Sequence, residues 1–247
     1  MTKRLEKNQV ICGDFYDELL KVQMKSVDMI LTDLPYNITQ NKWETELDLR
    51  KMWDLFHHVL KDTGVICLTS VQPFTSKLVM SNPNEFKHEW IWEKDGGSNF
   101  ANTVREPMKE HESVLIFSKG KWTYNPIKQE RIGSRKGKTT KSQYKTKTEN
   151  YGKFVDNDSV DVNELRVPRS IQRFTRERGL HPTQKPTLLF EYLINTYTNE
   201  NDTVLDCCAG SGTTAIACLN TNRNYICIEK EPKYYDIIKE RIEGLTQ

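Results

Sequence analysis

The sequence predicts an α/β protein built on a mainly parallel, doubly wound sheet. Short apolar runs alternate along the chain with segments of helical spacing, which is the order of a parallel sheet covered by helices. Several runs, such as residues 27–33, are too continuously apolar for a strand with one exposed face. A glycine-rich turn at 209–214 links one such run to a helix, which closes a strand–helix unit of this class.

The elements follow in chain order. Residues 9–12 predict a short strand, with a turn at 13–14 and a helix start behind it. The segment 49–62 has one apolar stripe at helical spacing, and Gly64 is expected to end this helix. Residues 120 to about 178 lack any period, which predicts an insertion or a long loop. Further strands are expected at 27–33, 65–70, 88–94, 113–119, 203–208 and 225–229, and further helices after the proline turn at 181–186, after the glycine turn and at 232–245.

The composition excludes several classes of protein. With 247 residues, 36% hydrophobic and 28% charged, the chain is expected to be globular rather than disordered. No apolar run approaches the ~20 residues that cross a bilayer, and none follows the charged N-terminus, so we expect a cytoplasmic protein without membrane contact. The histidines and cysteines lack metal-ligand spacing, so no metal is expected. The cysteines at 12, 67, 207, 208, 218 and 227 are interpreted as reduced thiols, with a disulfide between the adjacent pair as the alternative.

Basic residues are concentrated in one segment. Between Arg131 and Arg178, thirteen Lys or Arg stand against six Asp or Glu, a local excess of 13 − 6 = +7 in a chain of net charge +2. The remainder therefore carries 2 − 7 = −5. Such a segment predicts either a polyanionic partner or a solvated lysine-rich loop, and charge alone leaves both open.

The glycine turn predicts a nucleoside-cofactor site. Gly210 and Gly212 let the backbone approach a ligand closely, and the following helix offers free N–H groups. Glu229, nineteen residues after Gly210 at the end of the next strand, can accept hydrogen bonds from ribose hydroxyls. The match to the dinucleotide fingerprint is weak by itself, and a plain strand–helix turn is the alternative.

The position of this turn indicates a permuted order of strands. Only about 35 residues follow Gly212, so the other strands of the sheet must precede it. The strand at 9–12 is then expected beside the strand at 225–229. This neighbourhood would bring Asp14 to the same cofactor.

A carboxylate, a proline and a tyrosine end the apolar run at 27–33. Ligands of such sheets bind at the carboxyl ends of the strands. Asp33 and the carbonyl before or at Pro35 supply two acceptors, and Tyr36 supplies an aromatic face. This set suits an exocyclic amine on a planar heterocycle. A proline turn capped by Asp33 is the alternative.

Three motifs in a fixed order resemble one family. The tetrapeptide Asp-Leu-Pro-Tyr at 33–36 comes first, "HPTQKP" at 181–186 second and "DCCAGSGTT" at 206–214 last. The order is similar to that of the amino-methylating DNA methyltransferases of the β arrangement, which modify adenine N6 or cytosine N4. The resemblance covers nearly the whole chain apart from the basic segment. Leu34 stands where the family usually has proline, which puts the rigidity of the turn in doubt.

The resemblance implies a fold, a cofactor and a partner. The fold is a Rossmann-like S-adenosylmethionine-dependent methyltransferase fold with circularly permuted motif order and a basic insertion. Residues 1–120 would form the catalytic half, 121–178 a basic target-recognition region and 179–247 the cofactor-binding half. S-adenosylmethionine is the implied cofactor and double-stranded DNA the implied partner. A homodimer and a cognate restriction endonuclease are left open.

The resemblance also assigns site residues and a reaction. A flipped base would present its amino group to the tetrapeptide for direct in-line methyl transfer. Aspartate at position 33 favours N6 of adenine, with N4 of cytosine as the alternative. The implied catalytic residues are Asp33, Leu34, Pro35 and Tyr36; the cofactor-binding residues are Asp14, Thr183, Lys185, Asp206, Ala209, Gly210, Gly212, Thr213 and Glu229; the DNA-binding residues are Arg131, Arg135, Lys136, Lys138, Lys141, Lys145 and Lys147.

Other functions explain part of the pattern. A nicotinamide-dependent oxidoreductase would account for the glycine turn but not for the tyrosine motif or the permuted order. A non-catalytic DNA-binding protein would not need an intact Asp33, Tyr36 and Gly212. A methyltransferase acting on RNA or protein is distinguished only by its substrate.

Overall fold

The computed structural model describes residues 5–36, 47–130 and 165–246 of the chain. The chain divides into two compact units, one of residues 1–125 with 170–247 and one of residues 126–169. In the second unit the described residues pair as two short antiparallel strands, β6 (Gln129–Glu130) and β7 (Leu165–Arg166). All elements discussed below belong to the first unit.

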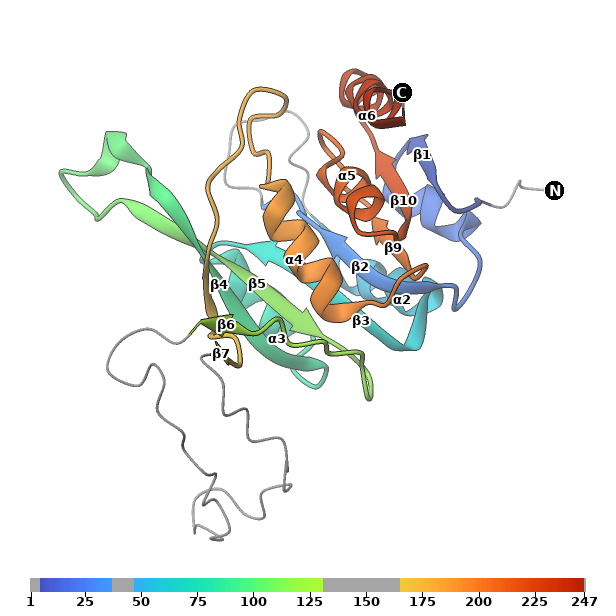
Figure 1. Cartoon of the computed structure of the whole chain (residues 1–247), viewed down its shortest axis with the longest axis horizontal. Helices are drawn as coiled ribbons and strands as arrows, with labels where there is room; N and C mark the ends of the chain where they lie inside the picture. The colour runs from blue at the N-terminus through green and yellow to red at the C-terminus, as the bar shows by residue number, and fades with distance from the viewer. Residues whose placement is uncertain (1–4, 37–46, 131–164, 247) are drawn as a thin grey trace, which may run out of the picture. The chain divides into compact units, whose positions relative to one another are not determined.

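The first unit is built on a mixed sheet whose strands follow the order β1-β10-β9-β2-β3-β5-β4-β8 (Figure 1). In the described part of the chain, every neighbouring pair is parallel except the two that involve β5. The prediction of a mainly parallel sheet is thus confirmed. The strands are β1 (Gln9–Cys12), β2 (Val27–Thr32), β3 (Leu60–Ser70), β4 (Phe86–Ser98), β5 (Lys109–Phe117), β8 (Ile171–Arg173), β9 (Thr203–Asp206) and β10 (Asn224–Glu229).

The permuted order of strands is also confirmed. β1 pairs in parallel with β10, and Cys12 lies opposite Glu229 in the register. The first strand therefore lies at one edge of the sheet, beside the last strand in chain order. The backbone N–H of Gly13 continues this pairing by donating to the Glu229 carbonyl at 2.9 Å.

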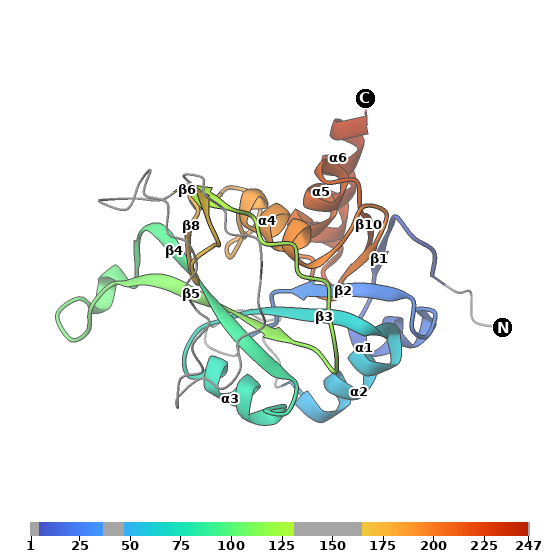
Figure 2. The same cartoon turned by 60° about the horizontal axis from the view of Figure 1, so that its bottom comes forward.

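Helices cover both faces of the sheet (Figure 2). The first three lie on one face and the last three on the other, as a doubly wound sheet requires. The helices are α1 (Phe15–Glu18), α2 (Leu49–Val59), α3 (Phe74–Ser81), α4 (Thr187–Tyr197), α5 (Thr213–Asn220) and α6 (Pro232–Thr246), with 3₁₀ turns at Leu19–Lys21 and Phe100–Asn102.

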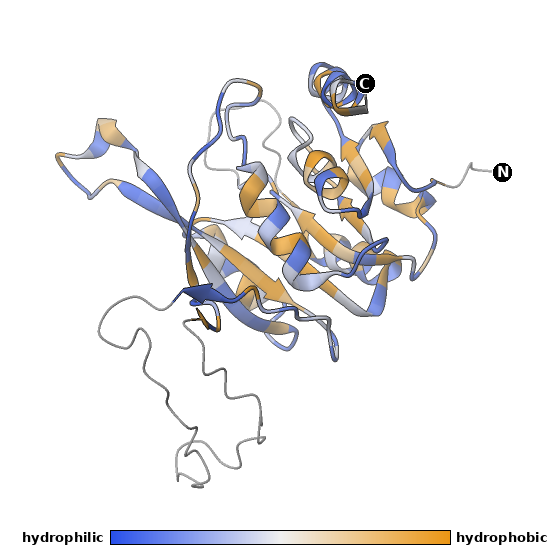
Figure 3. Ribbon diagram, viewed as in Figure 1, coloured by the Kyte–Doolittle hydropathy of each residue, from blue (hydrophilic) through white to orange (hydrophobic). Residues whose placement is uncertain are grey.

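Each face of the sheet has its own apolar core, and the central strands are coloured as the most hydrophobic part of the ribbon (Figure 3). Along β2 the side chains alternate, so that Ile30 packs under α2 while Met29 and Leu31 pack under α4. All three are fully buried. This burial on both faces explains why the run at 27–33 shows no alternation of polar and apolar residues.

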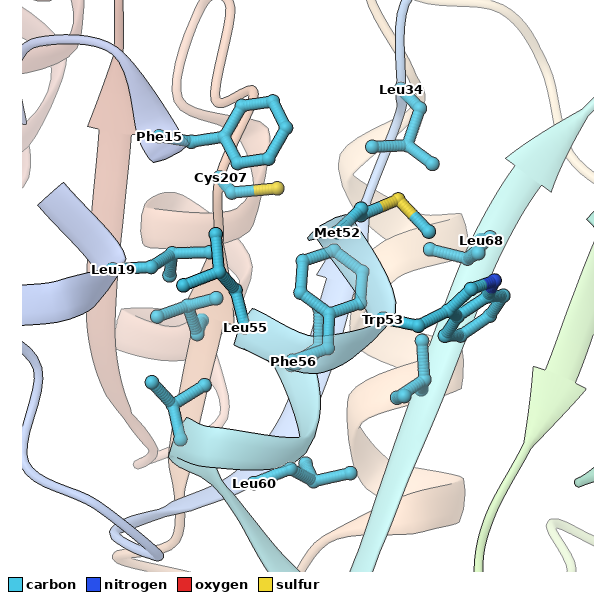
Figure 4. Packing of buried hydrophobic residues seen from close by; sticks show 14 of the residues in the cluster. Phe15, Leu19, Leu34, Met52, Trp53, Leu55, Phe56, Leu60, Leu68 and Cys207 are labelled. Atoms are coloured by element: carbon cyan, nitrogen blue, oxygen red, sulfur yellow. The ribbon is translucent and has the colours of Figure 1, made fainter. Parts of the chain in front are cut away.

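Helix α2 supplies much of the first core. Asp48 caps it by accepting a hydrogen bond from the backbone N–H of Lys51 at 3.0 Å. Its apolar stripe then packs against the sheet, and Met52 and Phe56 are fully buried (Figure 4). Full burial of side chains of this size contributes about 1.5–3 kcal/mol each.

Three features of the fold differ from the sequence-based expectations. Helix α2 ends at Val59, not at Gly64, and the chain passes directly into β3. Gly64 lies within β3, where a Cβ atom would stand 2.6 Å from the Leu60 side chain, so close approach explains this glycine. Helix α3 was not predicted. Residues 171–173, expected to be irregular, form β8 beside β4.

Candidate active site

One pocket lies at the carboxyl ends of β1, β2, β9 and β10. Because parallel strands share one direction, the residues that follow them meet at the same edge of the sheet. The structure brings most of the predicted site residues to this pocket. Its lining includes Asp14, Asp33, Pro35, Tyr36, Thr183, Lys185, Asp206, Ala209, Gly210, Thr213 and Glu229.

Two predicted site residues do not line the pocket. The Leu34 side chain is only 2% exposed and points into the first core toward Met52 and Leu68, so only its backbone is available to a ligand (Figure 4). Gly212 lies later in the same turn and is packed against the Ile238 side chain of α6. The seven predicted DNA-binding residues, Arg131 to Lys147, lie outside the described residues.

The Asp33 carboxylate is held by donors from three parts of the chain. One oxygen, Oδ1, accepts from the hydroxyls of Tyr36 and Thr69, and Oδ2 accepts from the Lys185 ammonium. Thr69 arrives by strand register, because Thr32 of β2 lies opposite Leu68 of β3. The side chain of Asp33 stays 19% exposed, so the carboxylate is fixed in direction yet open to the pocket.

Lys185 links Asp33 to a second buried ion pair. Its side chain is 6% exposed, and its Nζ lies 3.5 Å from Oε2 of Glu112 in β5. The other oxygen of Glu112, Oε1, lies 2.6 Å from the ammonium of Lys94 in β4. Burial acts to lower the pKa of Lys185, but the carboxylates of Asp33 and Glu112 raise it above its ordinary value. Lys185 is therefore a cation at neutral pH.

Tyr36 is fixed as a neutral phenol. Burial, followed by the nearby carboxylates of Asp33 and Glu112, raises the pKa of its hydroxyl well above 10. Its ring lies 5.5 Å from the ring of Phe74, tilted by 39°. The hydroxyl donates to Asp33 and lies 3.1 Å from the hydroxyl oxygen of Thr69, and the ring lines the pocket next to the Asp33 carboxylate.

The glycine turn is held to the sheet by Glu229. The carboxylate of Glu229 accepts from the backbone N–H groups of Gly210 at 2.7 Å and of Glu231 at 2.8 Å. Burial raises the pKa of this carboxyl above its ordinary value. The hydroxyl of Thr213 donates to the Lys185 carbonyl at 3.2 Å and so joins the turn to the 181–186 motif.

Gly212 is required by its backbone and by its surroundings. Its φ of +81° lies in the left-handed region, and a Cβ atom would stand 2.7 Å from Cγ2 of Ile238. We expect Gly212→Ala to lower the free energy of unfolding by about 1–3 kcal/mol. Gly244→Ala is the matched control in α6, because a Cβ there meets nothing within 4 Å. Thermal unfolding of both variants checks this, and equal stability of the two would contradict it.

Asp206 ends β9 as a buried carboxyl. It accepts from the Thr214 hydroxyl and from the backbone N–H of Cys208 at 3.0 Å. Burial is the largest influence, and it raises the pKa of Asp206 from 3.8 to about 6 although the hydrogen bonds oppose the change. The folded protein therefore binds this proton more tightly than the unfolded chain does.

This pKa predicts a pH-dependent stability. Raising the pH through the window from 3.8 to about 6 removes stability, because the unfolded chain loses the proton first. The loss of unfolding free energy amounts to about 3 kcal/mol, because each unit of pKa difference corresponds to about 1.36 kcal/mol. In Asp206→Asn the loss disappears, so the difference in unfolding free energy, variant minus wild type, should rise by about that amount across the window. Denaturant titrations at several pH values test this, and a constant difference would refute it.

Asp14 and Thr183 both line the pocket and are held by local hydrogen bonds. Asp14 caps α1 through the backbone N–H of Tyr16 at 3.0 Å and forms an ion pair with Lys230 at 3.0 Å. Burial acts to raise the pKa of Asp14, but Lys230 and the cap lower it overall. Thr183 bonds to Nδ1 of His181, whose ring lies 4.3 Å from that of Tyr234.

Sequence reasoning missed several residues of this pocket and its support. Thr69 could have been found, because it lies near the carboxyl end of an apolar strand expected to be parallel to the one before Asp33. Glu112 carried a weaker signal, an acidic residue directly before the buried run at 113–117. Lys94 carried none. The pocket lining that was not predicted also includes Tyr16, His181, Gln184, Lys230, Glu231 and Tyr234.

The described residues contain no group of three or more His, Cys, Asp or Glu arranged to hold a metal ion. The six cysteines are free thiols, so the predicted reduced state is confirmed and the disulfide between Cys207 and Cys208 is not formed. Among residues 5–36, 47–130 and 165–246 there is no helix with the length and hydropathy to span a bilayer.

The chain is similar to known DNA methyltransferases over almost its full length. The DNA methylase family model for N6 and N4 enzymes matches residues 27–240. The type II methyltransferase M.HpaI of Haemophilus parainfluenzae is 26% identical over 251 residues, which cover 96% of this chain and 74% of that protein. The DNA adenine methyltransferase YhdJ of Escherichia coli K12 is 28% identical over 259 residues, 96% of this chain and 83% of that protein.

Solved structures are also similar to this chain. The M1.HpyAVI–SAM complex superposes with a TM-score of 0.63 at 25% identity and covers 95% of this chain and 98% of that one. The cytosine-N4-specific PvuII DNA methyltransferase has a TM-score of 0.68 at 16% identity, with 97% and 87% covered, and supports the fold alone. The family match spans the tetrapeptide at 33–36, the glycine turn and the strands of the sheet from β2 onward, and the chain belongs to the N6/N4 family of DNA methylases.

Proposed function

We propose that the chain transfers a methyl group from S-adenosylmethionine to the exocyclic N6 of adenine in double-stranded DNA. The observation that carries this proposal is the Asp33 carboxylate, fixed at the end of β2 and facing the pocket that the glycine turn helps to line. The same edge of the sheet thus offers an acceptor for an amino group and a cradle for a nucleoside.

The pocket fits S-adenosylmethionine by the chemistry of its lining. Glu229 ends β10, Asp14 follows the neighbouring strand β1, and the two offer acceptors to ribose hydroxyls and to an adenine amino group. Gly210, at a φ of +54°, brings backbone rather than a side chain to the ligand. Asp206 and Asp33 add negative charge, which suits a sulfonium cation. When bound, this cofactor supplies an electrophilic methyl group.

Asp33 would act on the amino group that receives the methyl. A carboxylate oxygen that accepts one N–H of the amine directs the nitrogen lone pair toward the pocket, and a backbone carbonyl at Leu34 or Pro35 accepts the other. Acceptors placed for the tetrahedral nitrogen stabilise the transition state more than the ground state. The Tyr36 ring would hold the base by stacking. The proton is then lost to water rather than held on Asp33.

The choice of adenine rests on two supports. YhdJ, with which the chain aligns over 96% of its length, is named a DNA adenine methyltransferase. The resemblance in the tetrapeptide also favours adenine where the first residue is aspartate. N4 of cytosine is the alternative, because one carboxylate serves either amine.

The basic segment at 131–147 is proposed to contact DNA phosphates. The support is its charge, since seven Lys or Arg fall within these seventeen residues. A homodimer and a cognate restriction endonuclease remain predictions from the resemblance, and sedimentation analysis of the purified protein tests the first of them.

Product analysis tests the proposed function directly. The protein is incubated with S-adenosylmethionine and unmethylated DNA, and the DNA is digested to nucleosides for mass spectrometry. N6-methyladenine is the expected product, and sequencing of the methylated DNA then gives the recognition site. N4-methylcytosine would keep the mechanism and change the base. Absence of both products with cofactor bound would overturn the proposal.

A further inference from the structure

One carboxylate oxygen of Glu112 is buried and accepts no hydrogen bond from the described residues. Its Oε1 lies 2.6 Å from the Lys94 ammonium, but among the described residues no donor forms a hydrogen bond with Oε2. This oxygen is buried and lies 3.5 Å from Nζ of Lys185. An unsatisfied carboxylate oxygen is costly in such a position, so its place next to a cation calls for a physical reason.

The Lys185 ammonium occupies the oxygen that the reaction needs. Oδ1 of Asp33 already accepts from Tyr36 and Thr69, and Lys185 bonds to Oδ2. An ammonium–carboxylate hydrogen bond is about twice as strong as one between neutral groups, so a neutral amine competes poorly for Oδ2. The bond from the ammonium to Oδ2 has to weaken for the amine to compete, and a buried cation moves only toward another anion.

We propose that Glu112 is a positioning residue that draws the Lys185 ammonium away from Asp33 when the target amino group binds. The inference rests on the proposed function. A movement of Nζ by less than 1 Å shortens its separation of 3.5 Å from Oε2 to about 2.8 Å, an ordinary charge-assisted hydrogen bond. The same movement lengthens the separation of Nζ from Oδ2 of Asp33 from 2.5 Å to at most about 3.2 Å. Lys185 stays a cation, no proton changes place, and the weakened bond leaves Oδ2 a better acceptor for an N–H of the base.

Lys94 determines how strongly Glu112 attracts the Lys185 ammonium. It neutralises the far oxygen of Glu112, so Glu112 does not hold Lys185 away from Asp33 before the substrate arrives. The two carboxylates and two ammonium groups alternate in one buried row, from Asp33 through Lys185 and Glu112 to Lys94. The row has no net charge, and the ammonium can shift within it without leaving an ion unpaired.

The test compares Glu112→Gln with Glu110→Gln, an exposed glutamate on the same strand. Glutamine keeps the shape and can still accept from Lys94 through its carbonyl oxygen, but it carries no charge to draw the Lys185 ammonium. We expect Glu112→Gln to lower kcat for methyl transfer by about 10- to 100-fold, with the Kd for S-adenosylmethionine changed less than about twofold. Glu110→Gln should match wild type. A Glu112→Gln enzyme with wild-type kcat overturns the inference.

A pH profile separates positioning from damage to the fold. The groups facing the Lys185 ammonium are Asp33, Glu112, Tyr36 and His181, with Lys94 behind Glu112. Without the Glu112 charge, the pKa of Lys185 falls, so the ammonium on Asp33 becomes a neutral amine at a lower pH. The ratio of Glu112→Gln to wild-type kcat should therefore rise about tenfold between about pH 7 and about pH 9.5. A flat or falling ratio overturns the inference.

The two proposals fail in different ways. If wild-type protein yields no methylated base, the proposed function fails before any variant is made. If wild type methylates DNA and Glu112→Gln is slowed without recovery at high pH, only the role of Glu112 fails. Melting temperatures of both variants identify a loss of fold.

Discussion

Asp33→Ala is expected to lower the rate of methyl transfer by about 100- to 1000-fold while the Kd for S-adenosylmethionine stays within about threefold of wild type. The variant removes the acceptor that fixes the target amine, and an acceptor set for the transition state supports kcat more than binding. It leaves the glycine turn and Glu229 untouched, since neither bonds to Asp33. Lys185 retains Glu112 as a partner, so the variant does not leave a lone buried cation.

Asp54→Ala is the matched control for this variant. Asp54 is an exposed aspartate of α2, remote in the chain from any strand end that lines the pocket. Single-turnover methylation of DNA gives the rate, and calorimetry gives the cofactor affinity. If Asp33→Ala methylates within about tenfold of the wild-type rate, Asp33 is not the acceptor that the mechanism needs. If it loses cofactor affinity instead, the assignment of Asp33 to the amino group is wrong.

The parts of the fold that the sequence predicted are those that local physics decides. Burial on both faces forces a continuous apolar run, and so β2, β9 and β10 were visible. Positive φ favours glycine, so Gly210 and Gly212 marked their turn. Chain order then required β1 beside β10, and this neighbour was found without any local signal.

The parts that the sequence did not predict depend on partners distant in the chain. Helix α3 is eight residues long and has no side-chain cap, and its burial comes from the sheet rather than from a strong helical period. The reversed direction of β5 cannot be inferred from an apolar run, because parallel and antiparallel core strands show the same composition. Gly64 suggested a helix end, whereas its close contact with Leu60 within β3 explains it.

The same distinction, between local signals and distant partners, applies to the site residues. Asp33, Asp206 and Glu229 follow strands, and the rule for strand ends located them. Thr69 and Glu112 are positioned by register across β2, β3 and β5, which no single segment specifies. The row of charges behind Asp33 was therefore not predicted: Glu112 and Lys94 look like ordinary charged residues in the sequence, and Lys185 was assigned to the cofactor.

Affinity for DNA is expected to fall about 10³- to 10⁵-fold between about 50 mM and about 200 mM salt. Each Lys or Arg that neutralises a phosphate releases counterions, so the logarithm of the affinity falls with a slope of about −0.9 per contact. The basic segment supplies seven such residues in 131–147, whereas the acidic remainder of the chain repels DNA. Filter binding across a salt series measures the slope, and a flat response would exclude the segment as a phosphate contact.

Two charge-matched variants locate the effect. In the first, Lys136, Lys138, Lys141 and Lys145 are changed to Ser; in the second, the exposed lysines Lys7, Lys77, Lys119 and Lys233 are changed instead. Both remove four positive charges, so a general loss of attraction would weaken DNA binding equally in the two. Direct contacts predict that only the first variant loses about 3 to 4 units of the salt slope. Its rate with saturating DNA should be unchanged, because phosphate contacts bind substrate and transition state alike. An equal change in both variants would mean that net charge, and not this segment, draws the protein to DNA.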